Sequence, residues 1–245
     1  MSVVWRRRPA GARAVHGVRE LTATPDAASY VRLPDGRINV VIRHANGGRD
    51  GDVCVAGPRT KALRKHTPTG RATIIDVEVG WAVPVFGVSA SALTDRIVPL
   101  SEVWGARGAT LASTVLALRD SDRAVSAIAS AMMERAAAAP VSSAVQIARR
   151  ACVLLEAPGA RIEHVARELG VTERHLRRAF RDGTGVSPKQ FARAARLHRA
   201  VRIAKTEADW SRVAAAAGYS DQAHLVTEFR RLTGLTPAKF RAATR

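Results

Sequence analysis

Short runs of apolar, often β-branched residues alternate with turn-forming residues through the first third of the chain. These runs occupy residues 38–42, 52–56 and 72–79, and Gly, Pro, Asn and Asp gather between them. Runs of this length between turn signals are typical of β-strands. The pattern predicts a small antiparallel sheet or barrel between about residues 14 and 79, and it does not distinguish the two. Residues 1–13 are basic and contain Gly and Pro, so we expect a loose tail there.

The spacing of apolar residues becomes helical from about Ala109. They recur every three or four positions, which places them on one face of a helix. Three such stripes follow one another: Leu111, Val115 and Leu118; Val125, Ile128 and Met132; and Val145, Ala148, Cys152 and Leu155. An alanine run that ends at Pro140 precedes the last stripe and is the best domain boundary. We therefore expect an α+β domain over residues 14–139, a sheet or barrel plus helices, and an all-α domain over residues 140–245.

A pattern that occurs twice dominates the all-α half. Each copy has a short apolar helix, a glycine turn, a helix cap, and a second helix with Leu and Phe four residues apart. The key positions are Gly170, Thr172, Leu176 and Phe180 in the first copy and Gly218, Ser220, Leu225 and Phe229 in the second. The glycines lie 48 residues apart but the Leu and Phe positions lie 49 apart, so one residue is inserted in the second turn. Ordered matches of this kind indicate an internal duplication.

Helix, glycine turn and a second helix with a free outer face form the helix-turn-helix arrangement of DNA-binding proteins. We place the first unit at about residues 161–182 and the second at about residues 209–232. Between them, Ser187 and Pro188 are typical of a helix start. They predict a long connecting helix from residue 188 to about residue 205.

The second copy also carries a specific motif. It runs Gly-Tyr-Ser-Asp-Gln-Ala-His-Leu-Val-Thr from Gly218 to Thr227 and ends in Gly-Leu-Thr-Pro at Pro237. On these residues, the segment 161–241 resembles the DNA-binding domain of AraC/XylS-type transcription regulators, which carry two helix-turn-helix units. The resemblance implies two recognition helices that bind successive major-groove segments of double-stranded DNA, with RNA polymerase as a further partner.

The charge of the chain agrees with a polyanionic partner. The formal net charge is +18, and the residues after Pro140 hold 20 Lys and Arg against 9 Asp and Glu. A basic domain of this kind favours nucleic acid, because contacts to phosphates release counterions.

The candidate DNA-binding residues lie on the outer faces of the two recognition helices. They are Thr172, Arg174, Arg177, Arg178 and Arg181 in the first unit and Ser220, Gln222, Ala223, His224, Val226, Thr227 and Arg230 in the second. The four arginines share one face with no acid interleaved, and arginine is the usual ligand of guanine O6 and N7. The resemblance implies that Arg181 meets phosphate while the other three approach bases.

The second recognition helix has a weaker face. Gln222 can pair with adenine, and Ala223 or Val226 can contact a thymine methyl group. Thr227 replaces an arginine that is common in the family, and His224 has a phosphate contact and a packing role as equal alternatives. We expect the first unit to carry most of the sequence discrimination.

The α+β half shows a second resemblance. The segment from Leu93 to Gly105, with residues 33–36 and 55–58, is similar to an N-terminal domain of uncharacterised function found on a subset of AraC-type regulators. We expect this half to sense a small-molecule effector or to form a homodimer. An architectural DNA-binding protein without an effector is the alternative.

Other chemistry has little support in the sequence. Cys54 and Cys152 are flanked by aliphatic residues, lack metal-ligand spacing, and are expected to be buried packing residues in a reducing compartment. An Ada-type alkyl-transfer enzyme would need a cysteine cluster in the first half, which holds only Cys54. We expect no catalytic residue, cofactor, metal or membrane association, and a cytoplasmic protein.

Overall fold

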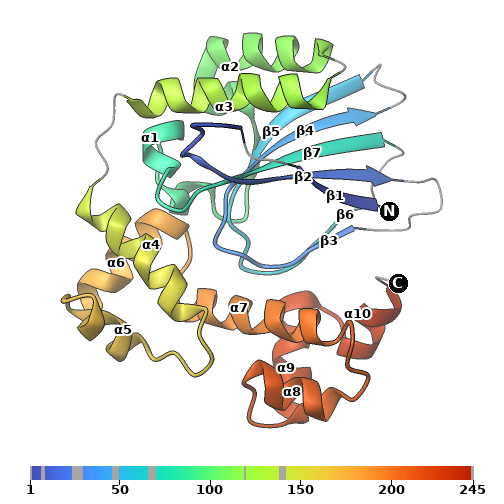
Figure 1. Ribbon diagram of the computed structural model, residues 1–245, viewed down its shortest axis with the longest axis vertical. Coiled ribbons are helices and arrows are strands. Elements are labelled where there is room, and N and C mark those ends of the chain that lie inside the picture. Colours follow the sequence, from blue (N-terminus) through green and yellow to red (C-terminus); the bar gives the residue numbers. More distant parts are fainter. Residues whose placement is uncertain are drawn as a thin grey trace.

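The computed structural model of the protein describes residues 2–6, 9–23, 30–45, 50–65, 70–118, 120–137 and 142–243. A sheet with covering helices forms its N-terminal part, and helices alone form its C-terminal part (Figure 1). The main sheet is antiparallel, with strands in the order β1 (Ser2–Arg6), β2 (Val15–Ala23), β7 (Gly70–Val77), β4 (Asn39–Ala45), β5 (Asp50–Ala56) and β8 (Ile97–Pro99). β3 (Tyr30–Arg32) and β6 (Leu63–Lys65) form a separate ribbon. Within the described residues the main sheet is open, with β1 and β8 at its edges, so the barrel alternative is wrong.

The prediction of a loose tail over residues 1–13 is wrong at its start. Ser2–Arg6 forms the edge strand β1, which pairs antiparallel with β2 over its full length. The Arg6 guanidinium also donates to Glu20 on β2, with 2.6 Å between Nη2 and Oε2. Three consecutive residues with high β-propensity, Val3-Val4-Trp5, explain the strand, because the edge of β2 supplies the hydrogen-bond partners that they lack in isolation.

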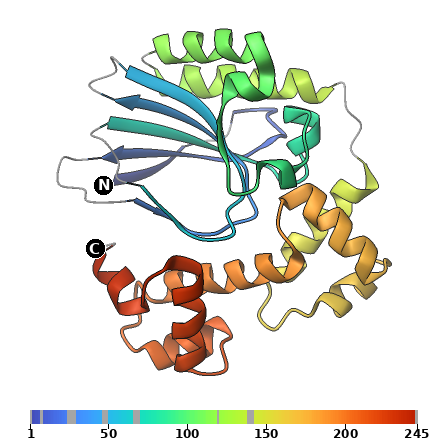
Figure 2. The ribbon, with the colours of Figure 1, turned by 180° about the vertical axis from the view of Figure 1, so that it is seen from behind.

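Helices cover one face of the main sheet (Figure 2). They are α2 (Leu100–Ala117) and α3 (Ser121–Ala137), and the shorter α1 (Ala82–Phe86) and η2 (Ala90–Leu93) follow β7. The predicted stripe residues Val115, Val125, Ile128 and Met132 are all buried in the core between sheet and helices. α2 begins at Leu100 rather than near Ala109 and bends at Gly105, whose φ of 63° interrupts the helix.

The C-terminal part consists of seven helices in the described residues. They are α4 (Ser143–Leu155), α5 (Ile162–Glu168), α6 (Glu173–Thr184), α7 (Pro188–Ile203), α8 (Trp210–Ala217), α9 (Gln222–Thr233) and α10 (Pro237–Ala243). The pair α5–α6 is the first helix-turn-helix unit and α8–α9 is the second, each around its own core. α7 joins them, and Ser187 with Gln190 forms the capping box that starts it. The predicted domain boundary at residues 139–140 lies outside the described residues and stays a prediction.

The N-terminal part docks on both units. Beside the first unit, Gly80 N–H donates to the carbonyl of Gly183 at 3.2 Å, and the Thr94 hydroxyl donates to the carbonyl of Gly185 at 2.7 Å. Beside the second unit, Ala62 N–H, next to β6, donates to the carbonyl of Leu232 at 2.7 Å. The sheet domain therefore lies along one side of α7 and contacts both units (Figure 1).

Candidate nucleic-acid interface

Capping and core packing fix the first recognition helix, α6. Its N-cap is Thr172, as predicted, and the Thr172 hydroxyl accepts a 3.2 Å hydrogen bond from His175 N–H. Leu176 and Phe180 are fully buried, and the Phe180 ring meets Phe191 of α7 edge-on at 5.4 Å. This packing leaves the opposite face of α6 to solvent.

All four predicted arginines lie on that solvent face. Arg174, Arg177, Arg178 and Arg181 are exposed. No acid lies between Arg174 and Arg181, but Glu173, immediately before them, forms an ion pair with Arg177 at 2.5 Å. Glutamate four residues before arginine is the favoured order on a helix, so the sequence contained this signal. Arg177 is thus engaged with Glu173, whereas the other three have no ion pair within the described residues.

The second recognition helix, α9, begins one residue later than predicted. Its N-cap is Asp221, not Ser220, and the Asp221 carboxylate accepts from His224 N–H at 2.7 Å. The Ser220 hydroxyl instead donates to Asp221 at 2.9 Å. The bond from His224 N–H, followed by the bond from Ser220, lowers the pKa of Asp221. A carboxylate is the better cap here because it also meets the positive end of the helix dipole.

The outer face of α9 carries less charge than that of α6. Gln222, Ala223, Thr227 and Arg230 are exposed, whereas His224 and Val226 are half-buried. The His224 ring packs edge-on against Tyr219 at 5.3 Å, and its Nδ1 lies 3.0 Å from the Ser220 hydroxyl. These contacts give His224 a packing role, and its phosphate contact stays a prediction.

The duplication is larger than the sequence analysis proposed. Ala148 and Ala151 on α4 correspond, 49 residues later, to Leu197 and Ala200 on α7, and all four are buried in the two unit cores. Each repeat is therefore a three-helix unit. In the sequence, the stripe of small apolar residues on α4 predicts a helix. It does not by itself show that this helix belongs to the repeat.

An ion pair that sequence analysis missed joins α7 to α9. Arg193 Nε donates to Glu228 Oε2 at 2.6 Å, and a second guanidinium nitrogen donates to Oε1, so the pair is bidentate. Burial alone would raise the pKa of Glu228, but the bonds from Arg193 outweigh it and lower that pKa. The pair holds the second recognition helix at a set angle to the connecting helix.

The two cysteines lie on β5 and α4 rather than on the recognition helices, and the possible metal ligands form no cluster in the described residues. Cys54 and Cys152 are buried, as predicted, and burial raises the pKa of Cys152 to about 12. No group of three or more His, Cys, Asp or Glu residues in the described part of the chain is arranged to hold a metal. No helix within the described residues is long and apolar enough to cross a membrane.

Sequence comparison identifies the class of the C-terminal part. The family model described as a helix-turn-helix domain matches residues 165–243, which cover both recognition helices. No curated protein sequence matches the chain. Residues 165–243 therefore form a helix-turn-helix domain.

A solved structure that covers nearly the whole chain supports the fold, and two others are similar to the C-terminal part in sequence. ToxT from Vibrio cholerae O395, bound to (E)-4-(8-methylnaphthalen-1-yl)but-3-enoic acid, is similar over 93% of this chain and 98% of that one, at 10% identity and a TM-score of 0.51. The C-terminal domain of AraT, a response regulator from Geobacillus stearothermophilus, is 27% identical over 42% of this chain and 89% of its own, with a TM-score of 0.39. The DNA-binding domain of AdpA in complex with a target DNA is 29% identical over 42% and 92%, with a TM-score of 0.37. The predicted fold class, an α+β domain followed by two helix-turn-helix units joined by a long helix, is confirmed.

Proposed function

We propose that α6 and α9 bind two successive major-groove segments on one face of double-stranded DNA, and that α6 supplies most of the sequence discrimination. If the segments are one helical turn apart, their centres lie about 34 Å apart. The observation that carries this proposal is the exposed arginine face of α6, held out by Leu176 and Phe180.

The positions of the arginines along α6 support base contacts near its N-terminus and a phosphate contact further along. Arg174, Arg177 and Arg178 lie nearer the N-terminus of the helix, the end that enters the groove in helix-turn-helix proteins. Arg181 lies a turn further on, where a contact to the phosphate backbone fixes position without reading sequence. Thr172 lies at the start of α6, where its hydroxyl can donate to phosphate, whereas Ser220 must release its hydrogen bond to Asp221 to do the same.

Regulation is the second part of the proposal. The sheet domain contacts Gly183 and Gly185 in the first unit and Leu232 in the second, so its position is coupled to the spacing of both. A small-molecule effector that changes this docking would change DNA affinity without touching DNA. Homodimer formation, contact with RNA polymerase, a cytoplasmic location and the lack of an enzymatic activity stay predictions.

Selection of DNA fragments bound by the full chain tests this function. The selected site is then varied one base pair at a time, and affinity is measured at constant salt. We expect large penalties in one segment and small ones about one turn away. Equal penalties in both segments, or no preferred sequence after selection, would contradict the proposal.

A further inference from the structure

A cleft of about 890 Å³ lies between the sheet domain and the connecting helix α7. Its sheet side includes Arg6, Arg19 and Arg37, and its α7 side includes Arg199, Arg202 and Lys205. Phe191 and Val201 are the larger apolar side chains in its lining, and Asp35, Asp76 and Glu156 are the acids against these six cations. The cleft is therefore dominated by cations contributed from both domains.

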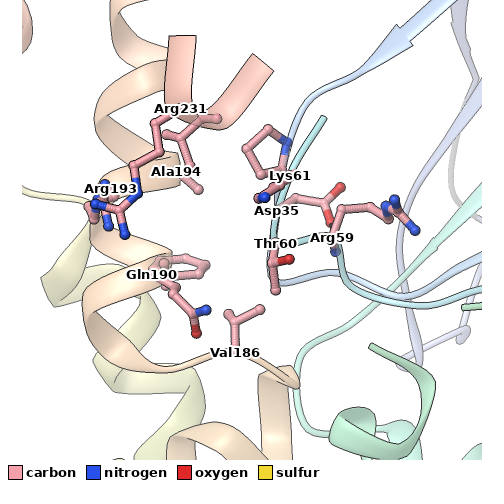
Figure 3. A pocket seen from close by; sticks show the side chains of 12 residues that line it. Asp35, Arg59, Thr60, Lys61, Val186, Gln190, Arg193, Ala194 and Arg231 are labelled. Atoms are coloured by element: carbon pink, nitrogen blue, oxygen red, sulfur yellow. The ribbon is translucent and has the colours of Figure 1, made fainter. Parts of the chain in front are cut away.

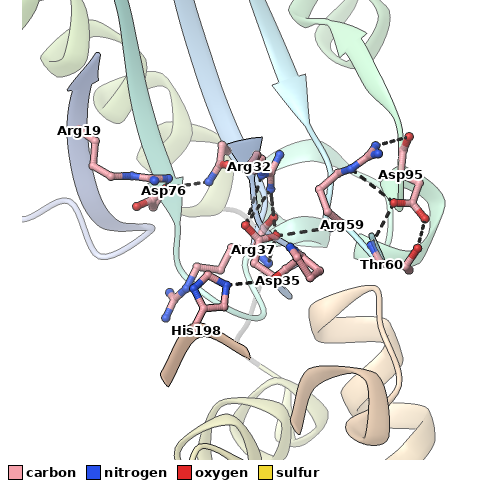
Figure 4. A network of polar contacts seen from close by, with 11 residues as sticks. Arg19, Arg32, Asp35, Arg37, Arg59, Thr60, Asp76, Asp95 and His198 are labelled. Atoms are coloured by element: carbon pink, nitrogen blue, oxygen red, sulfur yellow. Dashed lines mark hydrogen bonds and ion pairs between the residues drawn. The ribbon is translucent and has the colours of Figure 1, made fainter. Parts of the chain in front are cut away.

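Half of these cations already have partners. Arg6 is paired with Glu20, and Arg19 donates to the buried carboxylate of Asp76 at 2.6 Å (Figure 4). Arg199 donates to the carbonyls of Ala217 and Glu156. Their charges or hydrogen bonds are engaged in holding the fold together.

Arg37 differs from these arginines. It lies in the segment between β3 and β4, where neighbouring Gly36 is pressed so closely on Phe191 that a Cβ there would come within 2.9 Å of the ring. Arg37 Nη1 is buried and has no hydrogen-bond partner among the described residues. Arg37 as a whole is only half-buried and lines the cleft, so an anion there would pair with a charge that has no ion pair among the described residues.

Arg202 and Lys205 complete the set on the opposite wall. Both are exposed near the end of α7, and neither has an ion pair within the part of the chain that the structure describes. His198, one turn earlier, is held by a 2.9 Å contact between its Nε2 and the carbonyl of Pro34, which joins α7 to the same segment as Arg37 (Figure 4). Arg37 on one side and Arg202 and Lys205 on the other thus line the same cleft, at a contact between the domains.

We propose that this cleft binds a small anion with two or more carboxylate or phosphate groups, which bridges Arg37 to Arg202 and Lys205. One charged group per wall fits cations that come from two domains, and the few apolar lining residues, Phe191 and Val201 among them, give a long hydrocarbon chain little to contact. The bound anion stabilises the docked arrangement of the domains. This consequence for DNA binding rests on the function proposed above, but the binding itself does not.

Calorimetry on the full chain without DNA tests the site, with citrate, inorganic pyrophosphate, acetate and decanoate as separate probes at matched ionic strength. We expect citrate, pyrophosphate or both to bind at least tenfold more tightly than acetate and decanoate. The citrate and pyrophosphate arms distinguish a polycarboxylate from a phosphate ligand. Failure of both to bind, or tighter binding of decanoate, would overturn the proposal.

Variants then locate the site. Arg37→Gln and Lys205→Gln should each weaken binding of the bound probe at least tenfold, and Lys205→Gln changes an exposed side chain that the fold does not need. Arg107→Gln, which removes an exposed arginine on α2 outside the cleft, is the matched control and should bind as the unmodified chain does. Equal weakening in all three variants would mean a general charge effect and overturn the assignment. A gel-shift assay on the selected DNA site is a separate readout, so failure of DNA binding does not affect the binding result.

Discussion

The two helix-turn-helix units are nearly identical inside and different outside. In both, a buried threonine at the end of the recognition helix donates to the carbonyl of the core phenylalanine at 2.7 Å: Thr184 to Phe180, and Thr233 to Phe229. In both, that phenylalanine meets another edge-on, at 5.4 Å in the first unit and 5.3 Å in the second. Both helices end at a glycine with φ between 73° and 75°. The internal architecture has been kept at a constant spacing of 49 residues.

The outer faces differ at the same spacing. The corresponding pairs are Arg174 and Ala223, Arg177 and Val226, Arg178 and Thr227, and Arg181 and Arg230. Charge is thus retained only at the last position. The comparison teaches that the core of a helix-turn-helix unit sets where its recognition helix points, whereas the solvent face is free to set what that helix binds.

The two units also attach differently to the sheet domain. Both accept backbone-carbonyl hydrogen bonds from it, but next to the second unit a small cavity of about 130 Å³ also separates the segment 59–61 from Arg231 and Leu232 of α9 (Figure 3). In that cavity Lys61 and Arg59 come from the sheet domain, and Arg193 and Arg231 come from the helical one. The arginine–glutamate pair between α7 and α9 has no counterpart in the first unit, where alanines occupy the positions 49 residues earlier.

The largest effect should come from the shared interior. Phe180→Ala and Phe229→Ala each remove a fully buried ring, and each should cost about 3–5 kcal/mol of unfolding free energy. Chemical denaturation followed by circular dichroism measures both. Costs that differ several-fold would show that the two interiors are not equivalent.

Base contacts should separate the units. Arg177→Ala or Arg178→Ala should cost about 1–3 kcal/mol on the preferred site and little on random DNA. Thr227→Ala, at the position equivalent to Arg178, should cost much less. Fluorescence anisotropy on specific and random duplexes measures this, with Arg107→Ala as the charge-matched control. Equal losses on both duplexes would remove the base-reading role from the arginines.

An arginine at position 227 should make the two units more alike in how strongly they discriminate between bases. Thr227→Arg should strengthen binding by about 1 kcal/mol or more and sharpen base preference in the second segment, since one well-formed arginine–guanine pair discriminates by that amount. Repeating the base-pair scan with this variant measures the change. An unaltered scan would mean that the outer face of α9 is not directed at the bases.

Arg181 and Arg230, which occupy the one of the four compared positions where both units are charged, should contribute to DNA affinity in the same way. Arg181→Ala and Arg230→Ala should weaken binding to all sequences and each lower the slope of log affinity against log salt by about one. Affinity titrations at several salt concentrations give the slope. A sequence-dependent loss for either variant would assign it a base contact instead.

Acid should loosen α9 slightly more than α6. Because the pKa of Asp221 is lowered on folding, its capping stabilises the folded state above the unfolded value of about 3.9 and is lost as pH falls through the lower folded value. The lowered pKa of Glu228 acts in the same direction, whereas the Thr172 cap of α6 does not titrate. Hydrogen exchange measured between pH 5 and about pH 2.5 should show a selective loss of protection in α9. In Asp221→Asn this acid-dependent loss should be smaller. Equal loss in both helices would refute this difference.

Several features could be predicted from the sequence because they are local. Thr172 and Ser187 cap helices, and Leu176 with Phe180 defines a buried face, since a helix of fixed period turns sequence spacing directly into position. The second cap was misplaced by one residue because Ser220 and Asp221 are both good caps, and the backbone conformation, extended at Asp221, decides between them.

By itself, the sequence determined the duplication, the two recognition helices and the four-arginine face, because all of these depend on residues a few positions apart. Only the tertiary structure decided that Ser2–Arg6 becomes a strand, that Arg193 meets Glu228, and that Arg37 lines a cleft with residues of α7. Each of these depends on a partner far along the chain. Neither propensity nor periodicity carries information about which distant surface will cover a residue, so packing alone settles it.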